Sequence, residues 1–66
     1  MYKYLKVKNG NVIAVNDAGN PGMKYWNRGN AVRAYWSDLG EGFVEIHLNT
    51  GKIYIVNRGG NIFRSI

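Results

Sequence analysis

The clearest structural signal in this chain is residues 5–15, LKVKNGNVIAV. Apolar and polar residues alternate up to Asn9-Gly10, and an apolar run begins soon after that pair. Asn-Gly is the strongest short hairpin signal, because both central residues of a type I′ turn need positive φ. The segment therefore predicts a β-hairpin with two facing pairs, Val7 with Val12 and Leu5 with Ala14.

Residues 43–56 predict a second hairpin. Two sets of side chains alternate along its first half: Val44, Ile46 and Leu48 on one face, and Phe43, Glu45 and His47 on the other. Thr50-Gly51 is interpreted as a two-residue turn, which predicts the facing pairs Ile53 with Leu48 and Ile55 with Ile46. That register gathers the aliphatic side chains on one face. Because Thr is a poor type I′ residue, a bulged three-residue turn is the alternative, against which the hydrophobic pattern argues.

The remaining segments are shorter. Residues 17–22, DAGNPG, are expected to form a loop, since Pro21 cannot continue a central strand. Residues 61–66 are interpreted as a last strand. Residues 30–39 fit either a strand or a helix capped by Asn30 and Gly40, and we favour the strand.

An internal similarity supports the strand. Residues 27–33 resemble residues 57–64 with one inserted glycine, and residues 10–20 match residues 51–61 at five of eleven positions. We interpret both matches as one local device: a strand ends at Asn, turns through glycine and begins again at Asn. Asn and Gly suit such turns because both tolerate positive φ.

Composition places these segments in one small β domain over residues 1–66. The chain is 45% hydrophobic and 14% aromatic, has nine glycines and lacks cysteine. Isolated hairpins are unstable in water, so two of them must pack together. We expect an all-β fold of five or six antiparallel strands, in an SH3-like or OB-like barrel or a sandwich, with a short helix at 31–39 as the alternative.

Several functions find no support in the residues. Without cysteine and with His47 as the one histidine, neither disulfides nor a conventional zinc site is expected. No phosphate-binding glycine loop is present, and His47 with Glu45 on a strand face is a weak acid–base pair, so we expect no catalytic residue, cofactor or metal. The first residues lack the apolar run of a signal peptide, and no run is long enough for a membrane span. We expect a cytoplasmic protein.

Charge and alternation favour nucleic acid as the partner. Nine basic and four acidic residues give a net charge of +5. The outward positions of the expected strands mix aromatic rings with cations, which is how single strands are held: bases stack on the rings while Lys and Arg follow the phosphates. Glycine-rich turns beside arginines also let backbone approach phosphate. The expected interface, for single strands rather than duplex, is Tyr2, Tyr4, Lys6, Lys8, Arg33, Tyr35, Lys52, Tyr54, Arg58 and Arg64.

Two other classes remain open. The first is a protein-interaction module, such as a small inhibitor or regulator from a mobile element, anchored by exposed Tyr, Arg and above all Trp26. The alternative is that both tryptophans fill the core, a position that we expect for Trp36 more than for Trp26. The second is a carbohydrate or small-ligand binder that uses aromatic platforms. Free strand edges also allow pairing with a second copy of the chain.

Overall fold

The computed structural model describes residues 2–66, which form seven strands and no helix. The strands are β1 (Tyr4–Lys8), β2 (Asn11–Val15), β3 (Pro21–Trp26), β4 (Ala31–Trp36), β5 (Val44–Leu48), β6 (Ile53–Val56) and β7 (Ile62–Ser65). They build two antiparallel sheets, one in the order β1-β2-β3 and the other in the order β4-β5-β6-β7. The expected all-β class is confirmed.

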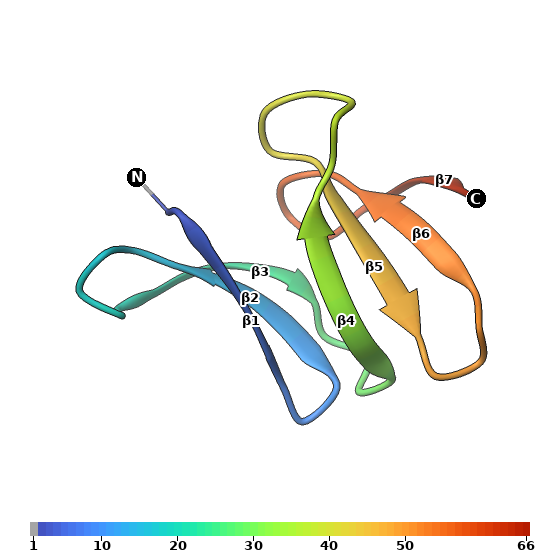
Figure 1. Ribbon diagram of the computed structural model, residues 1–66, viewed down its shortest axis with the longest axis horizontal. Coiled ribbons are helices and arrows are strands. Elements are labelled where there is room, and N and C mark those ends of the chain that lie inside the picture. The colour runs from blue at the N-terminus through green and yellow to red at the C-terminus, as the bar shows by residue number, and fades with distance from the viewer. Residues whose placement is uncertain (1) are drawn as a thin grey trace.

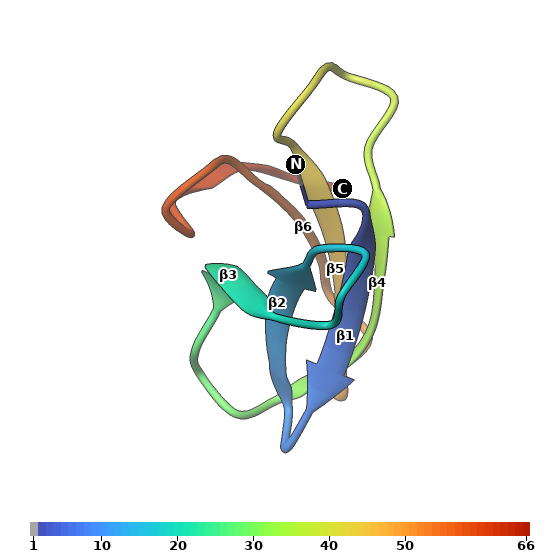
Figure 2. The ribbon, with the colours of Figure 1, turned by 90° about the vertical axis from the view of Figure 1, so that its left-hand side faces the viewer.

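The two sheets lie next to each other without closing into a barrel (Figure 1). β1, at one edge of the first sheet, runs alongside β4, at one edge of the second (Figure 2). Single contacts join them there: the Ala31 N–H donates to the Gly10 carbonyl at 2.9 Å, and the Trp36 indole N–H donates to the Lys3 carbonyl at 3.0 Å. The sheets therefore meet through a few specific bonds rather than a continuous ladder.

The first hairpin has the predicted register. Asn9 and Gly10 both have positive φ, 54° and 77°, as a type I′ turn requires. Val7 lies opposite Val12 and Leu5 opposite Ala14. The Asn-Gly pair thus sets the register, and the pleat turns the side chains of Val12 and Ala14 into the core.

The second hairpin forms, but its predicted register is wrong by one residue. His47, not Leu48, lies opposite Ile53, and Ile46 lies opposite Tyr54. The turn contains three residues: the Gly51 N–H donates to the Leu48 carbonyl at 3.0 Å, and Gly51 has a φ of 91°. The physical reason is the β-branched Thr50, which avoids the positive φ of a two-residue turn and leaves glycine to adopt it.

This one-residue difference changes the two faces of the second sheet. The side chain of Tyr54 points inward, where it is half-buried and stacked on Trp26 with 5.8 Å between ring centres. Ile53 and Ile55 point outward instead, across from His47 and Glu45. Ile55 is nevertheless buried, at 2% exposure, between its cross-strand neighbours on that outer face.

The middle of the chain holds two further outcomes. Residues 31–36 form β4, so the favoured strand is confirmed and the helix alternative is wrong. Residues 17–22 were expected to be a loop throughout, but β3 begins at Pro21. Proline is tolerated as the first residue of an edge strand, because the missing N–H faces away from the ladder. β3 is the strand that sequence patterning did not predict.

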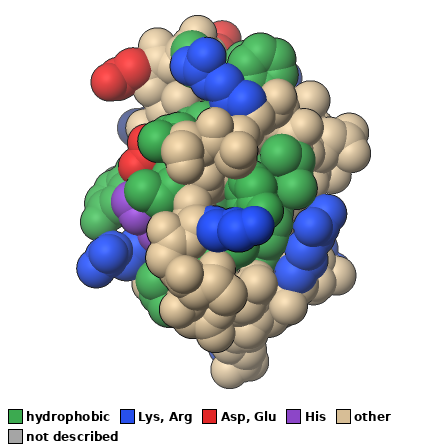
Figure 3. All heavy atoms as spheres, turned by 90° about the vertical axis from the view of Figure 1, so that its right-hand side faces the viewer, with side chains coloured by type: hydrophobic (Ala, Val, Ile, Leu, Met, Phe, Trp, Pro, Cys, Tyr) green, Lys and Arg blue, Asp and Glu red, His purple; other side chains and the backbone are tan. Residues whose placement is uncertain are grey.

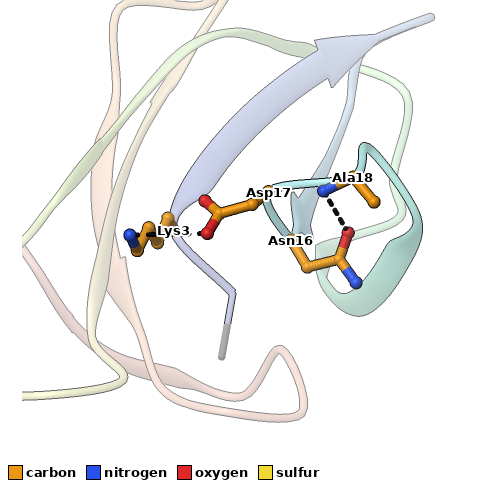
Figure 4. Close-up of polar contacts among 4 residues, drawn as sticks. All are labelled: Lys3, Asn16, Asp17 and Ala18. Carbon is orange, nitrogen blue, oxygen red and sulfur yellow. Dashed lines mark hydrogen bonds and ion pairs between the residues drawn. The ribbon is translucent and has the colours of Figure 1, made fainter.

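Two loops share the expected Asn-based device. In residues 16–20 the Asn16 side-chain oxygen accepts a hydrogen bond from the Ala18 N–H at 3.0 Å (Figure 4). The same oxygen accepts a second hydrogen bond from the Asn20 N–H at 2.9 Å. In residues 57–61 the Asn57 side chain accepts from the Asn61 N–H at 3.3 Å. Backbone bonds match as well, because the first Asn of each loop donates its N–H to the carbonyl of the last. Thus β2 joins β3 and β6 joins β7 through equivalent turns.

The core lies between the inner faces of the sheets. Val12, Ala14 and Trp26 come from the first sheet, and the second contributes Ala31, Val44, Ile46, Leu48 and Val56. Val44, Ile46, Val12 and Val56 are fully inaccessible. Each fully buried aliphatic side chain contributes about 1.5 to 3 kcal/mol, and this cluster holds the surface loops described below in place.

Candidate nucleic-acid interface

The outer face of the first sheet carries a row of residues across all three strands. Lys6 lies opposite Ile13, and Ile13 lies opposite Lys24. Because directly paired residues point to the same side of a sheet, two lysines flank one half-buried isoleucine. Tyr4 and Lys8 lie on the same face as Lys6, because each is two residues away from it along β1.

Two adjoining hollows continue from this row along β3. The first, about 190 Å³, is lined by Lys8, Asn9, Asn11, Ile13, Lys24, Trp26 and Asn27. The second, about 350 Å³, is lined by Lys24, Tyr25, Trp26, Asn27, Arg28, Gly59 and Gly60. They share Lys24, Trp26 and Asn27, and together are called the β3 groove here. The groove is lined by three cations, three asparagine side chains and two glycines.

Arg28 has a fixed position in the β3 groove. Its guanidinium carbon lies 4.7 Å from the centre of the Trp26 ring. The indole is itself held by stacking on Tyr54 and by an N–H bond to the Asn30 side-chain oxygen at 2.8 Å. A cation over an indole is a favourable arrangement, and a planar guanidinium can in turn stack on a base.

The crossover from β3 to β4 places Arg28 there. The Gly29 N–H donates to the Asn11 side-chain oxygen at 2.9 Å. Gly10 leaves no room beside it, since a Cβ at that position would lie 2.1 Å from the Gly29 carbonyl oxygen. The Asn9-Gly10 turn and the crossover therefore dock against each other, and glycine at position 10 permits the contact.

The far wall of the β3 groove is the loop of residues 57–61. A Cβ at Gly60 would lie 3.0 Å from the Tyr25 carbonyl oxygen, so this loop approaches the backbone of β3 closely. The Asn57 turn described above fixes the loop. Glycine backbone at such a wall can approach a phosphate without obstruction by side chains.

The charge of the β3 groove is uncompensated. No acidic residue lines either hollow. Within residues 2–66, Lys3 forms an ion pair with Asp17 at 3.5 Å and His47 is hydrogen-bonded to Glu45 at 2.6 Å, and neither contact belongs to the groove. Lys8, Lys24 and Arg28 are exposed. An acid-free groove with exposed cations and amide donors suits a phosphate backbone.

A second concave site lies on the other side of Tyr25. A hollow of about 330 Å³ is lined by Tyr2, Met23, Tyr25, Trp36, Glu41, Gly42 and Arg58. An adjoining hollow of about 340 Å³ shares Tyr2, Trp36, Glu41 and Gly42 with it. The two are called the Tyr2–Trp36 cleft. Burial raises the pKa of Tyr25 above its usual 10.0, and the nearby Arg58 charge opposes that rise.

The outer face of the second sheet is a different surface. Arg33 lies opposite His47, and Tyr35 opposite Glu45. The Tyr35 and His47 rings meet edge to face with 5.4 Å between centres. Figure 3 shows the side of the molecule with β6 and β7, where Lys and Arg atoms are separated from one another by apolar and neutral groups. The side with β6 and β7 therefore carries separate cations rather than a continuous basic surface.

The structure divides the ten residues predicted to bind nucleic acid. Tyr4, Lys6 and Lys8 lie on the outer face of the first sheet, Arg33, Tyr35 and Arg64 on that of the second, and Tyr2 and Arg58 in the Tyr2–Trp36 cleft. Lys52 lies beside the turn between β5 and β6. Tyr54 was expected to point outward with His47, which is wrong because the three-residue turn directs it into the core. The ten residues do not form one surface.

The expected positions of the two tryptophans are reversed. Trp26, predicted to be an exposed anchor for a partner protein, is 3% exposed and belongs to the core. Trp36, predicted to be in the core, is 41% exposed. Trp26 pairs with Val12 on the inner side of the first sheet, whereas Trp36 ends β4 beside the open cleft.

Two cations of the β3 groove were missing from the predicted interface. Lys24 was not identified because β3 was not predicted as a strand. Arg28 is one of the arginines beside the glycine-rich turns, but its contact with Trp26 follows only from the fold. The one sequence signal for the contact is that Arg28 follows Trp26 by two residues, a spacing at which a cation can fold back over an aromatic ring.

Within residues 2–66 the structure assembles no set of metal ligands. No group of three His, Asp or Glu side chains comes together there. Residues 2–66 also contain no helix that is long and apolar enough to span a membrane.

No protein-family model, curated protein sequence or solved structure matches this chain.

Proposed function

We propose that this protein is a small, non-enzymatic domain that binds single-stranded nucleic acid along the β3 groove. The observation that supports this most is the run of Lys8, Lys24 and Arg28 along two adjoining acid-free hollows. Cations in such a groove release condensed counterions when they neutralise phosphates, which supplies affinity without regard to base sequence.

The shape of the groove favours a single strand over a duplex. Residues 2–66 form no helix that could enter a major groove, a usual route to duplex bases. The groove offers instead the plane of Arg28, supported by Trp26, on which an unpaired base can stack. Asn9, Asn11 and Asn27 add side-chain amides that can donate to phosphate or sugar oxygens.

The test compares two double variants of equal charge. Lys8→Gln/Lys24→Gln removes two cations of the groove, whereas Arg33→Gln/Lys52→Gln removes two exposed cations that line none of the hollows described. Binding of a labelled single-stranded oligonucleotide of about 12 nucleotides, within the usual range for a small domain, is measured by anisotropy at about 50 mM salt.

We expect the groove variant to bind roughly tenfold more weakly and the control variant to bind within about twofold of the unmodified protein. Equal losses in both variants would mean that only overall charge matters. No binding by the unmodified protein would exclude the proposal, and a protein partner would then be the leading candidate.

A further inference from the structure

We propose that the Tyr2–Trp36 cleft takes one unstacked base of the bound strand and prefers a base with an exocyclic amino group. This inference rests on the proposed function, since the strand is delivered by the β3 groove. It assigns a role to two exposed rings and two opposite charges that the groove itself does not use.

The Trp36 ring is a fixed platform. Its indole N–H is bonded to the Lys3 carbonyl at 3.0 Å, and its ring meets Tyr25 edge to face at 6.0 Å and 89°. It remains 41% exposed. A ring already held in place loses little conformational freedom when a base stacks on it, which favours binding.

Tyr2 forms a second aromatic surface of the cleft. A Cβ at Gly22 would lie 2.1 Å from the Tyr2 ring, so the ring rests directly on glycine backbone. Tyr2 is 45% exposed. At about 330 Å³ the hollow lined by Tyr25 and Arg58 is at the lower end of small-ligand sites, a size suited to a single base.

The two charges of the cleft recognise different parts of a nucleotide. Arg58 packs on Gly42, since a Cβ at Gly42 would lie 2.6 Å from the Arg58 Nε. Glu41 directly precedes Gly42 in the chain, yet Glu41 and Arg58 form no ion pair. A guanidinium only donates hydrogen bonds and a carboxylate only accepts them. Arg58 therefore suits a phosphate, and Glu41 suits the amino group of cytosine, adenine or guanine.

Thymine and uracil would place a carbonyl oxygen where cytosine has its amino group. Facing the Glu41 carboxylate, that oxygen finds no donor. The cleft should therefore distinguish cytosine from thymine although the two rings are similar in size.

The β3 groove leads to the cleft. Both are lined by Tyr25, and Arg58 of the cleft precedes Gly59 of the groove in the chain. A strand that follows the groove past Gly59 arrives at Arg58.

The experiment measures the affinity of the full chain for oligo(dC) and for oligo(dT) of about 12 nucleotides. Binding is followed by anisotropy and by tryptophan fluorescence. We expect oligo(dC) to bind about fivefold more tightly or better. Glu41→Gln should remove this preference by raising oligo(dT) affinity, because the neutral amide can donate to the thymine oxygen and does not repel phosphate. Trp36→Phe should remove most of the fluorescence quench, since Trp26 is buried. Circular dichroism checks that each variant is folded. If Trp36→Phe is unstable, the Glu41→Gln variant still tests the proposal, because Glu41 is exposed in a loop.

The outcomes separate the two proposals. Equal affinity for both oligonucleotides, unchanged by Glu41→Gln, overturns the cleft while Lys8→Gln/Lys24→Gln still weakens binding. Absence of any oligonucleotide binding overturns the proposed function and the cleft together.

Discussion

The Arg28 guanidinium carbon lies 4.7 Å from the centre of the Trp26 ring. This contact connects the core to the surface, since Trp26 is buried and Arg28 is exposed. The indole thereby holds in place a cation that would otherwise move freely on the crossover between the sheets. Under the proposed function, that orientation is what a stacking base and a nearby phosphate require.

Arg28→Lys tests the orientation separately from the charge. Lysine keeps the positive charge and loses the plane that stacks. We expect about fivefold weaker binding, from roughly 1 kcal/mol of lost stacking, with an unchanged dependence of affinity on salt. Arg28→Gln is the control, which should also reduce the salt dependence. Binding of Arg28→Lys equal to that of the unmodified protein would show that the plane has no role.

Gly10→Ala tests the docking of the first turn on the crossover. Gly10 and Gly51 both have positive φ, so alanine at either costs about 1 to 2 kcal/mol. At Gly10 the added Cβ also meets the Gly29 carbonyl, whereas at Gly51 nothing lies within 4 Å. We expect Gly10→Ala to lose about 1 to 3 kcal/mol more than Gly51→Ala in urea unfolding. Equal losses would contradict the close contact.

Asn16→Ala tests the Asn-based loop. The Asn16 side-chain oxygen accepts two backbone hydrogen bonds, so its removal should cost about 1 kcal/mol or more of unfolding free energy. Asn16→Asp keeps an acceptor and should retain most of the stability, as thermal unfolding can measure. An alanine variant as stable as the unmodified protein would mean that the backbone bonds alone hold the loop.

Tyr25→Phe tests the effect of burial on the phenol. Burial raises the pKa of Tyr25 above 10.0 in the folded protein. The resulting stabilisation is complete below about pH 10, the unfolded value, and is lost as the pH rises through the folded pKa. Unfolding free energy should therefore fall less steeply above pH 10 in Tyr25→Phe than in the unmodified protein. The exposed Tyr4→Phe is the matched control, and parallel curves for all three proteins would contradict the assignment.

Local turn chemistry made part of the fold predictable. Asn9-Gly10 set a register that the structure reproduces, and the repeated Asn device appears in the two loops that join β2 to β3 and β6 to β7. The predicted register of the second hairpin is wrong because the aliphatic pattern favours a two-residue turn, whereas β-branched Thr50 avoids the positive φ that such a turn needs. That error turned Tyr54 to the wrong face, since one residue of slip reverses a strand.

The site was less predictable than the fold, because it is assembled by packing between distant segments. Lys8 and Lys24 come together only once β3 is known to pair with β2. Burial of Trp26 depends on the second sheet covering it, which no local pattern indicates. Alternation predicted which side chains point outward from the first sheet, but it could not predict which of these outward side chains line the same groove.

The salt dependence of binding to a single-stranded oligonucleotide tests the central claim most directly. For three phosphate contacts from Lys8, Lys24 and Arg28, the plot of log affinity against log salt should have a slope of about −2, at roughly 0.7 per contact. Lys8→Gln/Lys24→Gln should make the slope shallower by about 1.4, and Arg33→Gln/Lys52→Gln should leave it unchanged. Equal slopes in the two double variants, or no binding at about 50 mM salt, would contradict an interface along the β3 groove.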